Sequence, residues 1–459
     1  MVTARKIFRW GLRLGLAGGS LLLIGVTLLY LWLPKRTTAP SDVLAGGQGV
    51  WVEKGPQGYQ LMVEDQPFFI QGATGNQSLS RLAQHGGNAF RIYYRERLEE
   101  RMAQADSLGL GMMVGLGMPA ARHGFPYADE AKVDSLIDVL RAVVRSYRDH
   151  PALLIWNVGN EITLFHGGDL AVWKAINRVA AMVHEEDPHH PVSYAMGTDY
   201  RRFVMARWFC PELDLLSINS FLTLTHPRQK WYSRWLGWQG PYVVSEWGAI
   251  GTWQATPTDW NAPLEPSDST KAHYLREFYT YELPGQRDLC LGTFAFFWGA
   301  KQERTHTWYS FFSAEGEKRQ TVDQLQFLWN QSLPDNLAPR ITQFELAGEE
   351  AQRDFYLPAG GSATARLKVR DPEQDSLDVT FELREEGDYR YAYGGDAEKS
   401  PAIISRQQGP ATTWTFDLPS RKGPYRLFVH VRDGQGNICS QNIPFFLMLT
   451  DQHLRPSAD

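Results

Sequence analysis

Two glutamates each end a short apolar run of the same kind. Ala152–Glu161 reads ALLIWNVGNE, and Tyr242–Glu246 reads YVVSE. Such runs are typical of strands buried on both faces, as in a parallel sheet. If both strands belong to one closed barrel, Glu161 and Glu246 rise from the same rim and face each other across its mouth. Two carboxylates so placed suit glycoside hydrolysis, in which one protonates the leaving oxygen and the other, ionised, attacks the anomeric carbon.

Eight apolar runs predict the strands that would position these glutamates. Helical patterns lie between them, and residues 133–147 carry the clearest apolar stripe. Eight alternations over about 230 residues predict an α/β fold with a (β/α)8, or TIM, barrel. A doubly wound open sheet would alternate too, but Gly72–Gly75 lacks its glycine-rich phosphate turn. The predicted strands are Phe68–Ala73, Asn88–Tyr94, Leu110–Leu116, Ala152–Glu161, Val192–Met196, Leu215–Asn219, Tyr242–Glu246 and Gly292–Trp298.

The segments FFIQGATG, GGNAFRIYY, IWNVGNE and VVSEWG resemble the barrel of glycoside hydrolase family 2. That family belongs to a clan of retaining glycosidases with an Asn-Glu pair ending strand 4 and a Glu ending strand 7. The resemblance covers roughly residues 50–330 and implies that Glu161 is the acid/base and Glu246 the nucleophile. It also implies that Asn160 bonds the sugar 2-hydroxyl, and neither a cofactor nor a metal is expected.

Two residues at other strand ends match further positions of the family. Arg91 matches an arginine near the nucleophile, where its charge would keep Glu246 ionised. Trp298 matches an aromatic floor for the sugar ring. A structural ion pair for Arg91 and a place in the core for Trp298 are the alternatives.

Weaker candidates for substrate contact are Asn219, Trp247, His166 and Glu303. Phe221 stands where many relatives have a tyrosine that bonds the nucleophile, so we expect another tyrosine, Tyr194 or Tyr200, to replace it.

Aromatic residues follow strands 6 and 7 in number. They would suit an extended glucan or an acceptor sugar, as in enzymes that remodel β-1,3-glucans by transglycosylation. The alternative is a hydrophobic helix packed on the barrel. These residues are Trp231, Tyr232, Trp235, Trp238, Trp253 and Trp260.

The N-terminus predicts a membrane anchor. Residues 15–33 are 19 positions without a charge, enough to cross a bilayer as a helix. More basic residues precede this segment than follow it, which predicts a cytoplasmic segment 1–14, a linker 34–50 and an exported catalytic domain. A signal peptide cleaved near residues 43–46 is the alternative. We therefore expect a single-pass protein of the inner (plasma) membrane whose catalytic domain is periplasmic or extracellular.

After a barrel domain at 51–332, residues 338–450 alternate apolar and polar positions between turns. This pattern predicts a small all-β sandwich, which resembles immunoglobulin-like or cadherin-like modules. Asp371, Glu373 and Asp375 could hold Ca²⁺, but their pattern favours an acidic solvated turn. The three cysteines indicate neither a metal site nor a disulfide framework, although one disulfide is possible.

The chain carries a formal net charge of −5 although residues 1–36 hold basic residues and no acid, which argues against a nucleic-acid partner. The sequence thus predicts a membrane-anchored retaining β-glycoside hydrolase acting on cell-envelope or extracellular polysaccharide. A β-glucan transglycosylase, and a non-catalytic protein that binds or guides polysaccharide, are the alternatives. A membrane polysaccharide synthase or export complex is a possible partner.

Overall fold

The computed structural model describes residues 33–38, 49–75, 77–224, 233–387 and 399–449. The predicted membrane segment 15–33 lies outside this range except for Leu33, as do residues 43–46 with the alternative cleavage site. Within the described part of the chain, every helix is too short or too polar to cross a bilayer.

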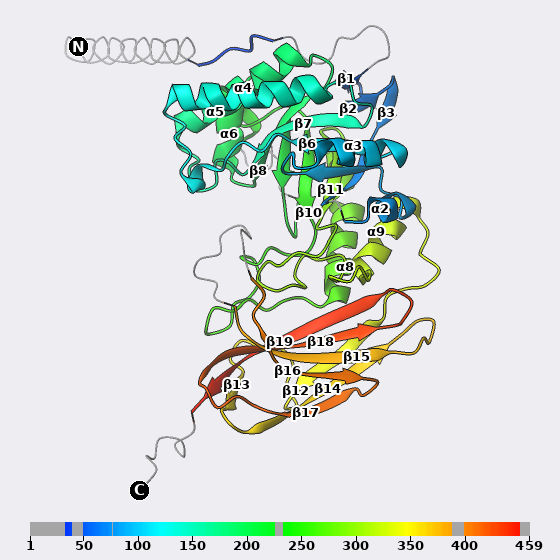
Figure 1. Ribbon diagram of the computed structural model, residues 1–459. Helices are drawn as coiled ribbons and strands as arrows, with labels where there is room; N and C mark the ends of the chain where they lie inside the picture. The colour runs from blue at the N-terminus through cyan, green and yellow to red at the C-terminus, as the bar shows by residue number, and fades with distance from the viewer. Residues whose placement is uncertain (1–32, 39–48, 76, 225–232, 388–398, 450–459) are drawn as a thin grey trace, which may run out of the picture.

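Eight parallel strands close into a barrel, in the order β10-β11-β4-β5-β6-β7-β8-β9 (Figure 1). All eight predicted strands are confirmed, with ends shifted by a few residues at most. Their interiors are almost entirely buried, which is why each reads as an apolar run. The strands are β4 (Ile70–Thr74), β5 (Ala89–Ile92), β6 (Gly111–Gly115), β7 (Leu153–Asn160), β8 (Val192–Gly197), β9 (Leu215–Asn219), β10 (Tyr242–Trp247) and β11 (Cys290–Phe296).

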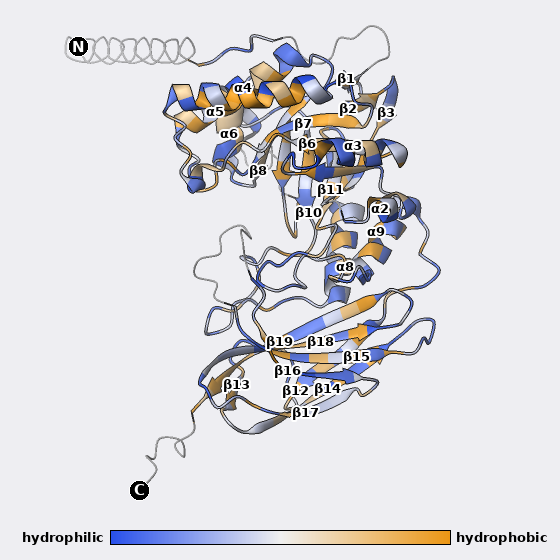
Figure 2. Ribbon diagram, in the orientation of Figure 1, coloured by the Kyte–Doolittle hydropathy of each residue, from blue (hydrophilic) through white to orange (hydrophobic). Residues whose placement is uncertain are grey.

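Helices between the strands cover the barrel, and α4 and α5 show alternating polar and apolar bands in Figure 2. In α4 the buried Val133, Ile137, Leu140 and Val144 form one stripe, and the Asp129 side chain caps the helix by accepting a bond from the Lys132 amide. The helices are α2 (Leu79–Gln84), α3 (Leu98–Ser107), α4 (Glu130–Tyr147), α5 (Leu170–Glu186), α6 (Tyr200–Phe209), α7 (Ser233–Leu236), α8 (Asp268–Glu277) and α9 (Gln320–Asn330).

An antiparallel sheet closes the end of the barrel where the strands begin. It consists of β1 (Val50–Gly55), β2 (Gly58–Val63) and β3 (Gln66–Phe68), and its apolar side chains join the core beneath the strands. Residues 36–38 bind at the same end. Arg36 donates to Asp214 (2.7 Å), and the Thr37 amide donates to Glu212 (2.6 Å), both just before β9. The segment that follows the predicted membrane span is therefore fixed to the end opposite the mouth.

Residues 340–448 form two sheets that share one core, in agreement with the predicted all-β character; the likeness to immunoglobulin or cadherin modules stays a prediction. Phe344 of one sheet packs with Phe381 of the other (ring centroids 6.2 Å apart). The three-stranded sheet contains β12 (Arg340–Leu346), β14 (Ser362–Arg370) and β17 (Thr413–Asp417). The five-stranded sheet contains β13 (Tyr356–Pro358), β15 (Asp378–Glu385), β16 (Ile403–Gly409), β18 (Gly423–Arg432) and β19 (Ile438–Met448).

The C-terminal sheets lie below the mouth of the barrel, with α8 and α9 between the two parts (Figure 1). Polar side chains join them. Arg319, ahead of α9, donates to Asp268 of α8 (2.9 Å) and to Ser440 of β19 (2.7 Å), and all three are buried. The loops that follow β10 and β11 therefore lie between the rim at the carboxyl ends of the strands and the sheets.

Candidate active site

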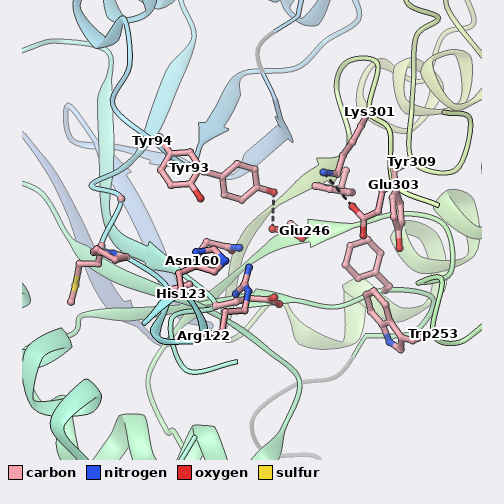
Figure 3. Close-up of a pocket in the computed structure, with 17 residues that line it drawn as sticks. Tyr93, Tyr94, Arg122, His123, Asn160, Glu246, Trp253, Lys301, Glu303 and Tyr309 are labelled. Atoms are coloured by element: carbon pink, nitrogen blue, oxygen red, sulfur yellow. Dashed lines mark hydrogen bonds and ion pairs between the residues drawn. The ribbon is translucent and has the colours of Figure 1, made fainter. Parts of the chain in front are cut away.

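Glu161 and Glu246 line one cavity of about 290 Å³ at the carboxyl ends of the strands (Figure 3). Glu161 follows the last residue of β7, and Glu246 is the penultimate residue of β10. The closed barrel thus brings together two carboxylates that are 85 positions apart in the sequence, as the strand pattern predicts.

Glu246 is held on one oxygen. Arg91 Nη1 donates to Oε1 (3.0 Å), and Tyr93 Oη donates to the same atom (2.8 Å; Figure 3). Arg91 is fully buried and Glu246 nearly so. Among the described residues, no hydrogen bond reaches Oε2 of Glu246.

Burial raises the pKa of Glu246 to about 7, although Arg91 lowers it; the neighbouring Glu161 raises it and the Tyr93 hydrogen bond lowers it. The contact between Arg91 and Glu246 is as expected. The expectation that this cation keeps Glu246 ionised is corrected, because the loss of water around the carboxylate raises its pKa by more than Arg91 lowers it. Burial also raises the pKa of Tyr93 far above its usual value, so its hydroxyl stays a donor.

Glu161 sits at a sharp turn of the backbone. Its φ of +48° lies in the left-handed region, which costs a residue with a side chain about 1–3 kcal/mol. Asn219 Nδ2 donates to Glu161 Oε1 (3.1 Å), while Ser245 Oγ donates to Asn219 Oδ1 (2.8 Å). The serine fixes the orientation of the Asn219 amide, so that its NH₂ group faces the carboxylate.

The Asn160 amide is oriented in the same way. Its Oδ1 accepts from Arg91 Nη2 (2.7 Å) and from Asn219 Nδ2 (3.2 Å). Because the carbonyl oxygen is engaged by the barrel, the NH₂ group is the end that a ligand in the cavity can use. This places Asn160 as a hydrogen-bond donor beside both carboxylates.

The tyrosine that bonds Glu246 is Tyr93, and not Tyr194 or Tyr200 as expected. Tyr194 Oη instead contacts Thr163 (2.9 Å) within the barrel core, and Tyr200 packs against Phe203 on α6. Tyr93 lies two positions after Arg91, so in an extended chain both side chains point the same way. That alternation is the signal by which the sequence could have identified it.

Three predicted substrate contacts lie elsewhere. Trp298 is fully buried against Phe312 (5.0 Å), so it forms part of the core and not the expected sugar floor. Trp247 is also fully buried and stacks on Phe278 (4.8 Å), and His166 is exposed on the loop after β7. None of the three lines the cavity; Phe296, at the end of β11, lines it instead.

The walls of the cavity come mostly from loops. Lys301 and Glu303 form an ion pair (3.2 Å) on the loop after β11, and Tyr309 lies on the same loop (Figure 3). Arg122 and His123 come from a short 3-10 helix after β6. Of these, sequence reasoning named only Glu303, because loop residues carry no periodic signal.

The aromatic residues expected around the mouth are scattered. Trp253 is 68% exposed and lines the cavity, whereas Trp235 and Trp238 do not line it. Trp260 packs on Phe446 of the C-terminal sheets (5.7 Å). Trp231 and Tyr232 lie outside the described residues.

Neither the acidic cluster nor the cysteines belong to this site. Asp371, Glu373 and Asp375 lie on the turn between β14 and β15, with ligand atoms within 4.8 Å of one another. Cys210, Cys290 and Cys439 are buried and unpaired, so the possible disulfide does not form.

The family model of the glycosyl hydrolases family 2 TIM barrel domain matches residues 78–306, a range that contains both glutamates. Over this range the barrel is similar to the family 2 TIM barrel domain. The β-glucuronidases of Homo sapiens and Sus scrofa are each 23% identical to the chain over 225 and 224 residues, 41% of this chain. The match covers 32% of each relative, so the chain corresponds to about a third of their length.

Solved β-glucuronidase structures are similar to this chain at low identity. The Bacteroides uniformis enzyme is 15% identical, with a TM-score of 0.46 over 87% of this chain and 48% of the other. The Ruminococcus gnavus enzyme is 16% identical, with a TM-score of 0.46 over 62% of this chain and 53% of the other.

Proposed function

We propose that the protein is a retaining β-glycoside hydrolase that works through a covalent glycosyl-enzyme intermediate. The observation that carries this proposal is the pair of carboxylates at the ends of β7 and β10 in one cavity, each held by its own donors. Residue pairs of this kind perform glycoside hydrolysis in two steps that share one acid/base.

In the first step, Oε2 of ionised Glu246 attacks the anomeric carbon while protonated Glu161 donates its proton to the leaving oxygen. Arg91 and Tyr93 hold Oε1, which aims the other oxygen at the substrate. In the second step, ionised Glu161 takes a proton from water, whose oxygen attacks the anomeric carbon and releases Glu246. Asn160 offers its amide to a sugar hydroxyl throughout.

Positively charged side chains at the cavity bear on the sugar. Arg122 and Lys301 line it, although Glu303 pairs with Lys301. The relatives are β-glucuronidases by name, and their substrates carry a carboxylate. An acidic sugar unit in a cell-envelope or extracellular polysaccharide is therefore the first substrate to test.

The test is a panel of p-nitrophenyl β-glycosides, namely glucuronide, glucoside, galactoside and mannoside, with the anomer of the first product followed by proton NMR. We expect turnover of at least one substrate with the β-anomer released first, and loss of turnover in Glu246→Gln. Release of the α-anomer first would contradict retention. No turnover across the panel, combined with measurable polysaccharide binding, would favour the non-catalytic alternative.

We also propose that the protein is anchored in the plasma membrane by residues 15–33 with its mouth directed away from the bilayer. The contacts of Arg36 and Thr37 at the opposite end of the barrel support this orientation. The full chain should remain in the membrane pellet after a carbonate wash, and a chain beginning at residue 34 should not. A polysaccharide synthase or export complex as partner stays a prediction.

Transglycosylation is a second candidate because of Trp253, whose exposed ring beside the cavity could stack an acceptor sugar. Mass spectrometry of products from β-1,3-glucan oligomers distinguishes the two reactions. Products longer than the substrate would support transfer, and shorter products alone would exclude it for this substrate.

A further inference from the structure

One loop, residues 297–319 between β11 and α9, contacts both the cavity and the C-terminal sheets. Its residues Lys301 and Glu303 line the cavity. Its residues Thr305 and Thr307 are buried and do not line the cavity, and both hydroxyls donate to Glu265 Oε2 (2.6 and 3.0 Å). A shift of Thr305 or Thr307 at Glu265 is therefore expected to shift Lys301 and Glu303 at the cavity.

Glu265 is the point where three parts of the molecule meet. Besides the two threonines, it accepts from Lys271 Nζ of α8 (2.6 Å) and from Asn442 Nδ2 of β19 (2.6 Å). Its side chain is only 2% exposed. Burial raises the pKa of Glu265, but Lys271 and the other donors lower it by more, to about 2, so the carboxylate is ionised at neutral pH.

The sheets hold their side of this junction rigidly. Asn442 is buried, and its Oδ1 accepts from Arg426 Nη1 (2.6 Å). Arg426 is itself bound to Glu386 (2.9 Å) and to the Pro263 carbonyl of the loop after β10 (3.0 Å). Hydrogen bonds on both sides thus hold the Asn442 side chain in place. Its amide cannot shift together with the loop unless these bonds break.

Thr305 and Glu303 are coupled through a tight turn. The Glu303 amide donates to the Thr305 carbonyl (3.1 Å), and the Thr305 amide donates to the Glu303 carbonyl (2.8 Å), with Arg304 between them at a φ of +63°. Two backbone bonds across one residue leave little freedom. The bond from the Thr305 hydroxyl to Glu265 therefore helps to position the Glu303 backbone, while Ser310 holds the backbone of its partner Lys301 (2.8 Å).

We propose that the C-terminal sheets are part of the substrate site: Thr305, Glu265 and Asn442 are positioning residues that hold the Lys301–Glu303 ion pair against the sugar. The pair offers an ammonium donor and a carboxylate acceptor side by side, which suits adjacent hydroxyl groups of a sugar unit. Its role is to bind and orient, whereas Glu161 and Glu246 carry out the chemistry. This inference rests on the glycosidase function proposed above.

The experiment compares Thr305→Val with Thr305→Ser in the full-length protein. Valine keeps the shape of threonine but cannot bond Glu265, and serine keeps the hydroxyl. Thr364→Val is the matched control, since its hydroxyl bonds Thr415 on the exposed face of β14. Hydrogen–deuterium exchange of residues 297–310 reports on the loop directly, and KM and kcat on the best substrate of the panel report on its function.

We expect faster exchange of residues 297–310 in Thr305→Val, with a KM raised about tenfold and kcat changed less than about twofold. Thr305→Ser and Thr364→Val should behave like the unaltered protein. Combined with Glu303→Gln, Thr305→Val should add little further loss, because both changes act on the same ion pair. Thr307→Val provides a second test should Thr305→Val fold poorly.

Unchanged exchange in Thr305→Val would overturn the inference even if the protein proved to have no glycosidase activity. In an active protein, an unchanged KM, or a loss that is fully additive with Glu303→Gln, would overturn it as well. Absence of turnover in the unaltered protein would instead count against the proposed function, and the exchange measurement would still decide whether the sheets hold the loop.

Discussion

Replacing Tyr93 with phenylalanine removes one hydrogen bond from Glu246 Oε1 and leaves the ring in place. A hydrogen bond to a charged group contributes about 1.5–3 kcal/mol, and about 1.36 kcal/mol corresponds to one pKa unit. The bond favours the ionised form, so its loss should raise the pKa of Glu246 from about 7 to between about 8 and 9. Only ionised Glu246 can attack, so activity should be lost mainly at low pH.

The assay is kcat/KM as a function of pH, whose acidic limb reports the pKa of the essential base in the free enzyme. At pH 7 we expect Tyr93→Phe to be about fivefold to fiftyfold less active than the unaltered protein, with the difference shrinking towards pH 9 to 10. Tyr94→Phe is the matched control, because Tyr94 lines the same cavity but is 57% exposed. An acidic limb that stays in place in Tyr93→Phe would refute the account of how Glu246 is tuned.

Three further predictions follow from the same contacts. The pKa of Glu246 rises on folding from its ordinary 4.5 to about 7, so its contribution to stability is complete at low pH and lost as pH rises through 7. Urea unfolding of Glu246→Gln and of the unaltered protein should therefore show that the free energy of unfolding of the variant, relative to the unaltered protein, increases by about 3 kcal/mol between pH 4 and pH 8. A difference that does not change with pH would contradict the raised pKa of the buried carboxylate. Glu161→Ala should lose about 10²–10⁴-fold in rate on substrates with poor leaving groups, whereas on an activated aryl glycoside azide should restore turnover and give a glycosyl azide product; lack of recovery on the activated substrate would put the acid/base role in doubt. Arg319→Met removes one of the two cations beside buried Asp268, leaving Lys271 at 3.5 Å, and should lower the free energy of unfolding by about 1.5–3 kcal/mol. Arg366→Met on the exposed face of β14 should lower it by less than about 0.5 kcal/mol, and equal losses would show that the Arg319–Asp268 ion pair does not stabilise the protein.

The barrel and its two glutamates could be predicted because their signals are local and repeated. A strand buried on both faces must be apolar along its length, and the residue at its end is the first one free to be polar. Glu161 and Glu246 stand at such ends, and closure of the barrel alone brings them together. No knowledge of loop structure was needed for this step.

The prediction that Trp298 forms an aromatic floor was wrong because the end of strand 8 shows no change from apolar to polar residues. Phe294, Phe296, Phe297 and Trp298 are all aromatic, so the sequence does not mark which ring faces the cavity. The strand ends at Phe296, which lines the cavity, and Trp298 turns into the core. Likewise, the contact between Arg91 and Glu246 was predicted correctly, but the raised pKa of Glu246 was not. The cost of burying a carboxylate depends on how the whole site packs, which no single residue of the sequence shows.

The loop that carries Lys301 and Glu303 could not be placed from the sequence either. Its position depends on Glu265 and Asn442, which are 40 and 137 positions from Thr305 along the chain. Contacts of this range follow from how two domains dock and leave no periodic trace.

The most direct test of the account is covalent trapping of Glu246 with a 2-deoxy-2-fluoro β-glycoside of the sugar that the panel identifies, followed by mass spectrometry of the intact protein and of its peptides. The account predicts one sugar per chain, attached at Glu246, and no adduct in Glu246→Gln. An adduct on another residue, or no adduct with a sugar that the unaltered protein turns over, would contradict it.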